Sequence, residues 1–355
     1  MKIKYYFCFK EDKRSSMDML GNFISNGQKK YKKNLVKSII PKTFTPNWIN
    51  KYNFIMRFER FVNYPIQAYF AKKSDIAHII DHSYSHLVSF LNAKKKVVTI
   101  NDLIPLIFQK KLKRSYLLFK YSVSKIKYFD HVIALSNQSK TDLIRYTGID
   151  KDKITVIYPN VENIFNQKKI DKIKIHNKYK IPKNKKKIIV FDTSFYKNYK
   201  FSLGIFSKLI KKNPNIILIK IGNFSKLQND VNYKDKIYSY NYLTRFQMSE
   251  IYKISDLLLF PSLYEGFGIP CMEAMKSGLP IVASSRGSLK EILHNKSIFN
   301  LSNQNIIVNH IHKLFTNINY LKKEKKISKT QSKKFQNHSY HTQVRKVYKD
   351  LLIIK

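Results

Sequence analysis

Two glutamates in the segment PSLYEGFGIPCMEAM, residues 261–275, have the types and spacing of a ligand site. Glu265 and Glu273 flank a stretch with two glycines and a proline. Glycines permit close backbone approach, and the N–H groups at a helix start attract anions. Carboxylate oxygens accept hydrogen bonds from hydroxyl pairs. The segment therefore predicts a ligand whose phosphates are flanked by hydroxyl pairs, as in a nucleotide diphosphate sugar.

The neighbouring elements indicate how this segment is held. The apolar run DLLLF before it predicts a strand, and PCMEAMKS after it predicts a helix with Pro270 at its first position and Gly278 at its end. In a doubly wound sheet, ligands bind beyond the carboxyl ends of the strands. We therefore expect Glu265 in a ligand-binding loop and Glu273 in the first turns of the helix. The alternative for Glu273 is an acid that only stabilises the helix start.

The chain of 355 residues is long enough for two domains and alternates strand-like with helix-like segments in both halves. This order predicts an α/β fold of two doubly wound, Rossmann-like domains facing across a cleft. A polar, lysine-rich stretch marks the boundary. The expected parts are an N-terminal domain at 1–160, a linker at 161–187, a C-terminal ligand-binding domain at 188–335, and a terminal helix at 336–355 that could pack back on the N-terminal domain.

The charge balance is strongly basic, with 67 Lys and Arg against 23 Asp and Glu, a formal net charge of +44. Such a charge attracts phosphates, anionic lipid or acidic substrates. The chain is also rich in Asn, Ile, Tyr and Phe, so A/T-rich codon usage accounts for much of the lysine. No nucleic-acid reader motif is present, and we expect no nucleic-acid partner. Cys8 and Cys271 form no C-x-x-C pair, which fits a reducing cytoplasm.

No apolar run reaches the ~18 residues of a membrane-spanning helix, which predicts a soluble protein or one at a membrane surface. The stretch 110–128 predicts an amphipathic helix. The residues expected on its core-facing apolar side are Leu112, Tyr116, Phe119, Val123 and Ile126. Its expected basic face is Lys113, Lys120 and Lys127, joined by Lys110, Arg114 and Lys125. Two interpretations stay open, a solvated surface helix or a helix that docks on anionic lipid.

The segment FPSLYEGFGIPCMEAMKSGLPIVASSRGSLKEI resembles the signature of the retaining GT-B glycosyltransferases of family 4. The resemblance extends, in the right order, to KKVVTINDLIPL, HVIALSNQSKTDLIRYTGIDKDKITVIYPNV and MSEIYKISDLLLFPS. It implies a GT-B architecture whose N-terminal domain is the acceptor side. It also implies retaining transfer of a hexose from a nucleotide diphosphate sugar to a hydroxyl acceptor. The acceptor would be an envelope polysaccharide or a lipid-linked glycan.

The resemblance also implies roles for matching residues. Glu265 would hold hydroxyls of the donor sugar, Glu273 would bind the ribose diol, and Lys197 would lie on the donor diphosphate. Asp102 and His82 are the candidate catalytic groups of the N-terminal domain. Further donor contacts are expected from Gly266, Phe267, Gly268, Ile269, Gly287 and Ser288. No metal or other cofactor is expected, because Lys197 and the helix start would stabilise the leaving group. The expected location is cytoplasmic, with the inner face of the plasma membrane as a peripheral site.

Three residues depart from the family pattern. Asp192 and Tyr196 stand where relatives usually carry glycine or arginine near the lysine, and Asn101 replaces the histidine of a His-Asp pair. These departures keep an alternative open. In that alternative, the chain is a degenerate GT-B homologue that binds a nucleotide sugar or a partner without turnover.

Overall fold

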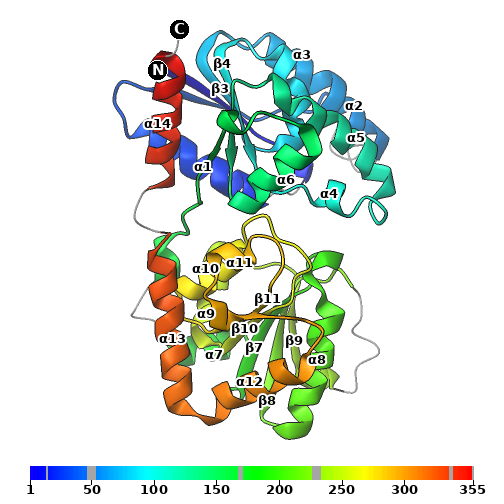
Figure 1. Ribbon diagram of the computed structural model, residues 1–355, viewed down its shortest axis with the longest axis vertical. Helices are drawn as coiled ribbons and strands as arrows, with labels where there is room; N and C mark the ends of the chain where they lie inside the picture. The colour runs from blue at the N-terminus through cyan, green and yellow to red at the C-terminus, as the bar shows by residue number, and fades with distance from the viewer. Residues whose placement is uncertain (13–14, 46–52, 167–170, 226–232, 336–338, 354–355) are drawn as a thin grey trace. The chain divides into compact units, whose positions relative to one another are not determined.

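The computed structural model describes residues 1–12, 15–45, 53–166, 171–225, 233–335 and 339–353, which form two compact units. Unit 1 comprises Met1–Pro159 together with His338–Lys355, and unit 2 comprises Asn160–Asn337. Each unit has its own parallel sheet (Figure 1). The prediction of two doubly wound, Rossmann-like domains is confirmed.

The sheet of unit 1 has six strands in the order β2-β1-β3-β4-β5-β6, and all neighbouring pairs are parallel. Its strands are β1 (Lys2–Tyr6), β2 (Leu35–Ile39), β3 (Ser74–Ile79), β4 (Ala93–Ile100), β5 (His131–Ala134) and β6 (Ile154–Val156). The helical segments described in unit 1 are η1 (Lys10–Asp12), α1 (Ser15–Lys29), α2 (Asn53–Phe58), the π turn η2 (Glu59–Asn63), α3 (Tyr64–Tyr69), the 3-10 segment η3 (His82–Phe90), α4 (Ile104–Ile107), α5 (Lys113–Ser124), η4 (Ile126–Tyr128), α6 (Asn137–Thr147), η5 (Lys151–Lys153) and α14 (Tyr340–Ile353).

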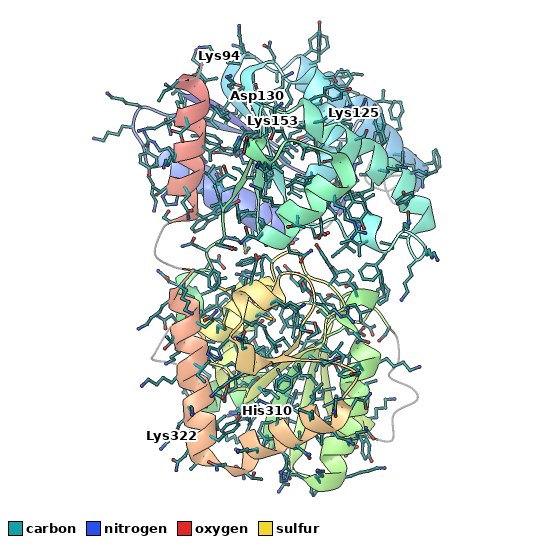
Figure 2. The ribbon with its side chains drawn as sticks, viewed as in Figure 1. Lys94, Lys125, Asp130, Lys153, His310 and Lys322 are labelled. Atoms are coloured by element: carbon teal, nitrogen blue, oxygen red, sulfur yellow. The ribbon has the colours of Figure 1, made fainter. Side chains whose placement is uncertain are left out.

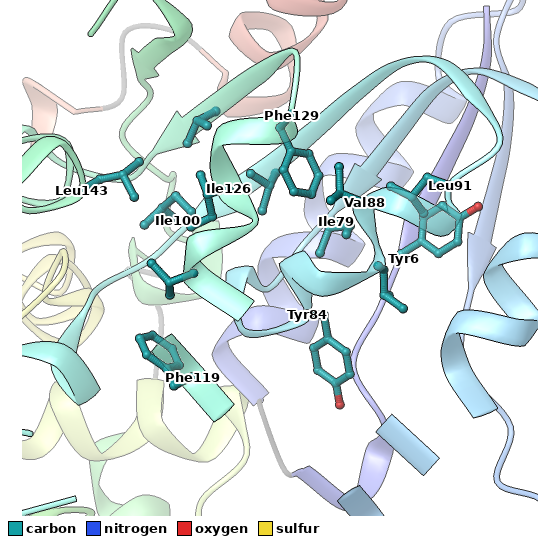
Figure 3. Packing of buried hydrophobic residues seen from close by; sticks show 14 of the residues in the cluster. Tyr6, Ile79, Tyr84, Val88, Leu91, Ile100, Phe119, Ile126, Phe129 and Leu143 are labelled. Atoms are coloured by element: carbon teal, nitrogen blue, oxygen red, sulfur yellow. The ribbon is translucent and has the colours of Figure 1, made fainter. Parts of the chain in front are cut away.

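The apolar core of unit 1 joins the strands to α5 and η3 (Figure 3). Ile79 and Ile100 come from β3 and β4, and Phe119 comes from α5. Of the residues predicted on the core-facing side of the 110–128 stretch, Phe119, Val123 and Ile126 are buried, as expected. Their burial removes apolar surface from water and holds α5 against the sheet.

The C-terminal helix α14 is part of unit 1 and lies beside α1 (Figure 1). Gly27 of α1 makes this approach possible, since a Cβ there would lie 2.3 Å from the ring of His341. The Tyr348 hydroxyl lies 2.5 Å from His78 of β3. Complete burial lowers the pKa of His78 to about 3, so this ring is neutral. The last helix is therefore locked to the sheet by buried polar contacts.

The sheet of unit 2 also has six parallel strands, in the order β12-β11-β10-β7-β8-β9. Its strands are β7 (Lys186–Phe191), β8 (Ile216–Ile221), β9 (Ile237–Tyr240), β10 (Leu257–Phe260), β11 (Ile281–Ser284) and β12 (Ile298–Phe299). Its α-helices are α7 (Lys172–Lys178), α8 (Tyr199–Lys212), α9 (Arg245–Ile254), α10 (Ile269–Lys276), α11 (Leu289–Ile292), α12 (Gln304–Thr316) and α13 (Ile318–Lys333).

Both faces of this second sheet are covered. Leu257 and Leu259 of β10 belong to a core shared with α8 and α12. Leu258 and Phe260 are also buried, although successive side chains of a strand point to opposite faces. The continuous apolar runs of these strands are typical of a parallel sheet that is buried on both sides.

The stretch 161–187, predicted to be a linker, contains helix α7 and lies within unit 2. Asp171 caps α7 by accepting hydrogen bonds from two backbone N–H groups, and Ile175 is buried. The Lys276 side chain of α10 donates to the Val161 carbonyl at 2.5 Å. This stretch is polar in composition, but a few buried contacts tie it to unit 2.

The strand order defines the edge at which each unit could bind a ligand. In unit 1, Lys94 and Asp130 mark the amino ends of β4 and β5 (Figure 2). Asn101 follows the carboxyl end of β4. In unit 2, the chain runs from β7 outward to β9 and then returns to β10 on the other side of β7. The carboxyl ends of β7 and β10 therefore flank the switch point, where doubly wound sheets bind ligands.

Candidate active site

The switch point of unit 2 is bridged by an ion pair between Lys197 and Glu265. Lys197 follows β7, Glu265 follows β10, and the Lys197 Nζ donates to Glu265 Oε1 at 2.7 Å. The two side chains are only 9% and 8% exposed. The loops that carry them are also joined, because the Leu263 N–H donates to the Tyr196 carbonyl at 2.7 Å. Two residues predicted from separate motifs thus form one charged pair.

The environment of Lys197 favours its charged form. Burial lowers the pKa of Lys197, but the Glu265 carboxylate raises it, and the net shift is upward. The ammonium also lies 4.7 Å from the ring centre of Phe260 and 5.3 Å from that of Tyr196. Lys197 is therefore a fixed cation, suited to stabilise negative charge on a leaving group.

Gly287 and Ser288 hold the backbone of Glu265. Gly287 has a φ of +56°, and a Cβ there would lie 2.6 Å from the Glu265 carbonyl oxygen. The Ser288 N–H and hydroxyl both donate to that oxygen at 3.1 Å. Both residues were expected to contact the donor, and the structure places them against the loop that carries Glu265.

The glycine loop leads into helix α10, as the sequence predicted. Gly268 has a φ of +84° and precedes Ile269, the first residue of α10. Glycine is favoured at Gly268 by this positive φ, and a Cβ there would also press on the end of the Leu289 side chain at 2.9 Å. Phe267 is buried and packs edge-on against Phe335. This arrangement places the start of α10 directly beyond the Glu265 loop.

Glu273 lies on α10 and is buried, with a side-chain partner at each carboxylate oxygen. Arg245 donates from Nη1 to Oε1, and the Tyr252 hydroxyl lies 3.1 Å from Oε2 and donates to it. Burial raises the pKa of Glu273, while Arg245 and Tyr252 lower it, and the net shift is upward. The carboxylate is therefore oriented by its partners. The positive charge of Arg245 offsets much of its negative charge.

Arg245 is a site residue that the sequence analysis did not identify. Its Nε donates to Glu162 at 2.8 Å, and its guanidinium lies 4.8 Å from the ring centre of Phe165. Its position was open to prediction, because Thr244 and Gln247 form a capping box that makes Arg245 the first residue of α9. Its contact with Glu273, by contrast, depends on how α9 and α10 pack.

Asp192, which departs from the family pattern, is neutralised inside unit 2. Its carboxylate lies 3.6 Å from the Nζ of Lys220, a fully buried lysine near the carboxyl end of β8. Ser225 donates to the same carboxylate from its N–H at 3.1 Å and from its hydroxyl at 2.7 Å. The Asp192 carboxylate is thus paired with a buried lysine, which stands in the otherwise apolar strand sequence IILIKI.

Unit 1 presents polar side chains at the carboxyl ends of its strands, and His82 lies 3.7 Å from the buried carboxylate of Asp81. Asp102 accepts a hydrogen bond from the Ile104 N–H at 3.0 Å, and His82 is buried with its ring edge-on to Phe119 at 5.3 Å. Among the residues that the structure describes, both amide atoms of buried Asn101 lack a hydrogen-bond partner. Ser136 caps α6 by accepting a hydrogen bond from the Ser139 N–H, which is a structural role.

The structure places Lys197, Glu265, Gly266, Phe267, Gly268, Ile269, Glu273, Gly287 and Ser288 in unit 2 and Asp102 and His82 in unit 1. The described parts of the chain contain no group of three or more His, Cys, Asp or Glu side chains that could hold a metal ion. The site chemistry in the described residues is that of paired carboxylates and cations.

Known proteins match the chain over most of its length. The family model for glycosyl transferases group 1 matches residues 171–338, and that for glycosyltransferase family 4 matches residues 25–162. An O-antigen chain mannosyltransferase, RfbU of Salmonella typhimurium, is 26% identical over 214 residues, 58% of this chain and 56% of RfbU. An uncharacterized glycosyltransferase of Methanocaldococcus jannaschii is 26% identical over 46% of this chain and 45% of its own. The chain thus spans about half the length of these relatives.

Solved structures share the whole fold at low sequence identity. HepE from Anabaena, crystallised with UDP-glucose, has a TM-score of 0.76 and 16% identity, and 99% of each chain is covered. Sucrose-phosphate synthase from Thermosynechococcus elongatus has a TM-score of 0.77 and 13% identity over both full chains. These likenesses define the fold class as GT-B.

Two Rossmann-like units, together with the likeness to these solved structures, place the fold in the GT-B class. The chain belongs to the group 1 glycosyl transferases, and the family resemblance seen in the sequence is confirmed.

Proposed function

We propose that this protein is a retaining hexosyltransferase that acts in glycan assembly. It would move a hexose from a nucleotide diphosphate sugar to a hydroxyl of a polysaccharide or lipid-linked acceptor. The printed names of relatives support this class, since RfbU is an O-antigen chain mannosyltransferase and HepE was crystallised with UDP-glucose. We further propose that the enzyme works at the cytoplasmic side and needs no cofactor beyond the donor itself.

The observation that carries the proposal is the Lys197–Glu265 pair at the switch point of unit 2. A diphosphate at this edge would place its charge beside the Lys197 ammonium and the start of α10. Glu265 would then accept hydrogen bonds from sugar hydroxyls. A cation and an acceptor 2.7 Å apart match a ligand whose phosphate and sugar are adjacent.

In the proposed reaction, the bond between the anomeric carbon and the leaving phosphate oxygen breaks, and the acceptor oxygen forms its bond on the same face. The acceptor proton passes to the leaving diphosphate, so that the products are a glycoside and a nucleoside diphosphate. Lys197 would stabilise the charge that grows on the leaving oxygen, and Glu265 would stabilise the positive charge of the sugar. Asp102 and His82 are proposed to act in unit 1, near the acceptor.

The nucleotide is proposed to bind through Glu273. Its carboxylate would accept two hydrogen bonds from the ribose diol, in place of or beside those from Arg245 and Tyr252. Gly287 and Ser288 would contribute through the Glu265 loop that they support. The glycine backbone from Gly266 to Ile269 would approach the sugar and phosphate.

The test is a titration of the full chain with a panel of nucleotide diphosphate sugars, followed by assays of donor hydrolysis and transfer. We expect one donor to bind and to be hydrolysed slowly, and proton NMR of the product to show the donor's anomeric configuration. An inverted product would contradict the retaining mechanism. Binding without hydrolysis or transfer would favour the degenerate homologue, and no binding would reject both functions.

A further inference from the structure

Five apolar side chains line the exposed side of the helical run formed by α2, η2, α3 and the C-cap residue of α3. They are spaced four residues apart: Phe54, Phe58, Val62, Ile66 and Phe70. Phe54 and Phe70 at the two ends are 71% and 78% exposed. Single exposed apolar residues are ordinary, but a continuous exposed stripe marks an interaction site. These five residues are called the apolar stripe below.

The π turn in the middle of this run keeps the stripe on one side. Residues four apart in an α-helix rotate steadily around its axis, because one turn takes about 3.6 residues. In η2, the Tyr64 N–H bonds to the Glu59 carbonyl, five residues back, which makes a wider turn. The wider turn counteracts the rotation, so the stripe extends for roughly 24 Å along the run.

The opposite side of the run anchors it to unit 1 without any help from the stripe. The Tyr64 hydroxyl donates to the Phe7 carbonyl at 2.7 Å. Buried Glu59 accepts hydrogen bonds from the N–H groups of Phe44 and Thr45, both at 2.9 Å. Because these contacts fix the inner side, the stripe is not needed for the core.

Helix α5 extends this surface. The rings of Phe61 in η2 and Tyr121 in α5 lie 6.3 Å apart, and α2 and α5 are neighbours in Figure 1. Leu117 is 70% exposed, and Tyr121 and Tyr128 are about half exposed. The apolar stripe and these three residues, whose segments meet at the Phe61–Tyr121 contact, are together called the docking face below.

Lysines surround the aromatic rings of the docking face. The Lys125 ammonium, labelled in Figure 2, lies 5.0 Å from the ring centre of Tyr121 and 5.7 Å from that of Tyr128. Lys127 lies 5.3 Å from the Tyr128 ring centre, and Lys120 is exposed. The side chains of Lys113 and Arg114 lie outside the described part of the structure.

Acidic residues are almost absent from these segments. Residues 110–128 contain no Asp or Glu, and residues 53–70 contain Glu59, which is buried. The docking face therefore combines aromatic and aliphatic side chains with positive charge that no exposed acid in these segments offsets. This is the composition of surfaces that lie in the interface of an anionic bilayer. Protein-protein interfaces, in contrast, are depleted of lysine.

We propose that the docking face binds an anionic lipid bilayer, with the helical run in the plane of the interface. The apolar stripe would enter the headgroup boundary, and Lys120, Lys125 and Lys127 would contact anionic headgroups. No helix among the described residues has the length and hydropathy needed to cross a bilayer. The proposal is independent of the proposed transfer reaction, because the docking face shares no residue with the site in unit 2.

The test is co-sedimentation of the full chain with phosphatidylcholine vesicles and with vesicles that also contain phosphatidylglycerol. We expect binding to the anionic vesicles at least about tenfold tighter than to phosphatidylcholine alone, and weaker binding as salt is raised. The variant Phe54→Ser/Phe58→Ser removes part of the stripe, and Lys120→Gln/Lys125→Gln/Lys127→Gln removes charge. Each is expected to lower vesicle affinity at least about tenfold with an unchanged melting temperature.

Matched controls come from unit 2. The variant Lys208→Gln/Lys211→Gln/Lys212→Gln makes the same charge change on the exposed side of α8, and Tyr242→Ser removes an exposed aromatic ring. Both should bind vesicles as the natural protein does. The proposal is overturned if no vesicle is bound or if the controls lose as much affinity as the test variants. It is also overturned if Phe54→Ser/Phe58→Ser converts a dimer to a monomer in sedimentation velocity while vesicle binding is unchanged, since the occupant would then be a second copy.

Discussion

The two units share one architecture but differ in the electrostatics of their ligand-binding edges. In unit 2, three carboxylates are buried with cations: Glu265 with Lys197, Glu273 with Arg245, and Asp192 with Lys220. In unit 1, the strand ends carry the buried amide of Asn101, the carboxylate of Asp102, and the buried carboxylate of Asp81, which lies 3.7 Å from the His82 ring. Each sheet has six parallel strands, so the sheet alone does not dictate this difference.

The contrast agrees with the proposal that unit 2 binds the charged donor. Removing ions from water is costly, and a buried pair seldom adds stability over apolar residues of the same volume. Under the proposed function, the pairs at the switch point and on α10 are therefore explained by ligand chemistry, whereas the Asp192–Lys220 pair has a structural role. Unit 1 carries its unusual charge outside, around the docking face.

The largest effect is expected from Glu265→Gln. If Glu265 supports the charge of the transition state, kcat should fall by about a thousandfold, as for loss of a key electrostatic group. The change also leaves Lys197 buried without its counter-ion, so the free energy of unfolding should fall by about 3 kcal/mol. Steady-state kinetics and urea titration measure the two effects.

The control for this change is Glu11→Gln, which alters an exposed glutamate of unit 1 and should change neither quantity. Nucleoside diphosphate affinity, measured by calorimetry, should change far less than kcat. Full turnover in Glu265→Gln would show that the active site does not lie at the switch point of unit 2.

Asp192→Ala should lower stability rather than catalysis. It leaves the fully buried Lys220 unpaired and the Ser225 N–H without an acceptor, at a cost of about 3 to 4 kcal/mol in unfolding free energy. The double variant Asp192→Ala/Lys220→Met should recover part of that loss. If the single variant instead binds the donor more tightly at unchanged stability, then Asp192 faces the phosphate and the comparison of the units must be revised.

Glu273→Gln should weaken the nucleotide. Hydrogen bonds to a charged acceptor contribute about 1.5 to 3 kcal/mol, so affinity for the nucleoside diphosphate should fall roughly 10- to 100-fold. The kcat at saturating donor should change less than the affinity does. An unchanged dissociation constant in calorimetry would show that the ribose does not contact α10.

Arg245→Gln should change the pH dependence of nucleotide binding. The ionised Glu273 is the better acceptor, so affinity declines as pH falls through its pKa, which is already raised above 4.5 by burial. Arg245 opposes that rise, and its removal raises the pKa further. The loss of affinity should therefore begin at a higher pH than in the natural protein. Calorimetry from about pH 5 to pH 8 measures this shift.

Arg145→Gln, at an exposed position of unit 1, is the control for that pH shift. It removes the same charge and should leave the pH profile unchanged. A lower affinity for Arg245→Gln with the natural pH profile would mean that Arg245 contacts the ligand itself instead of positioning Glu273.

The smallest effect is expected from Asn101→Ala in unit 1. The Asn101 amide has no hydrogen-bond partner among the described residues, so its loss should change stability by less than about 1 kcal/mol. The matched variant is Asn63→Ala, whose buried amide donates to the Lys42 carbonyl at 2.8 Å and which should cost at least about 1 kcal/mol more. Equal losses in urea titration would mean that Asn101 is a structural residue of unit 1.

Much of the fold was open to prediction from local pattern. Apolar runs and helix periods located most of the strands and the principal helices, and Ser136 and the Thr244–Gln247 capping box mark helix starts. The segment from Glu265 to Glu273 forms the loop and helix that its glycines and proline predicted. The stretch 161–187 resisted prediction, because its composition is that of a linker and its few buried residues depend on contacts with distant helices.

The sequence by itself determined which residues carry charge at which strand ends, because strand periodicity and turn residues are local properties. It also determined Glu265, Glu273 and Lys197 as candidates. Only the tertiary structure decided their partners: Glu265 meets a lysine 68 residues away, and Glu273 meets an arginine 28 residues away. Such pairs depend on the strand order and on the packing of α9 against α10. Neither has a local period from which it could be predicted, because both arise when separate buried faces pack together.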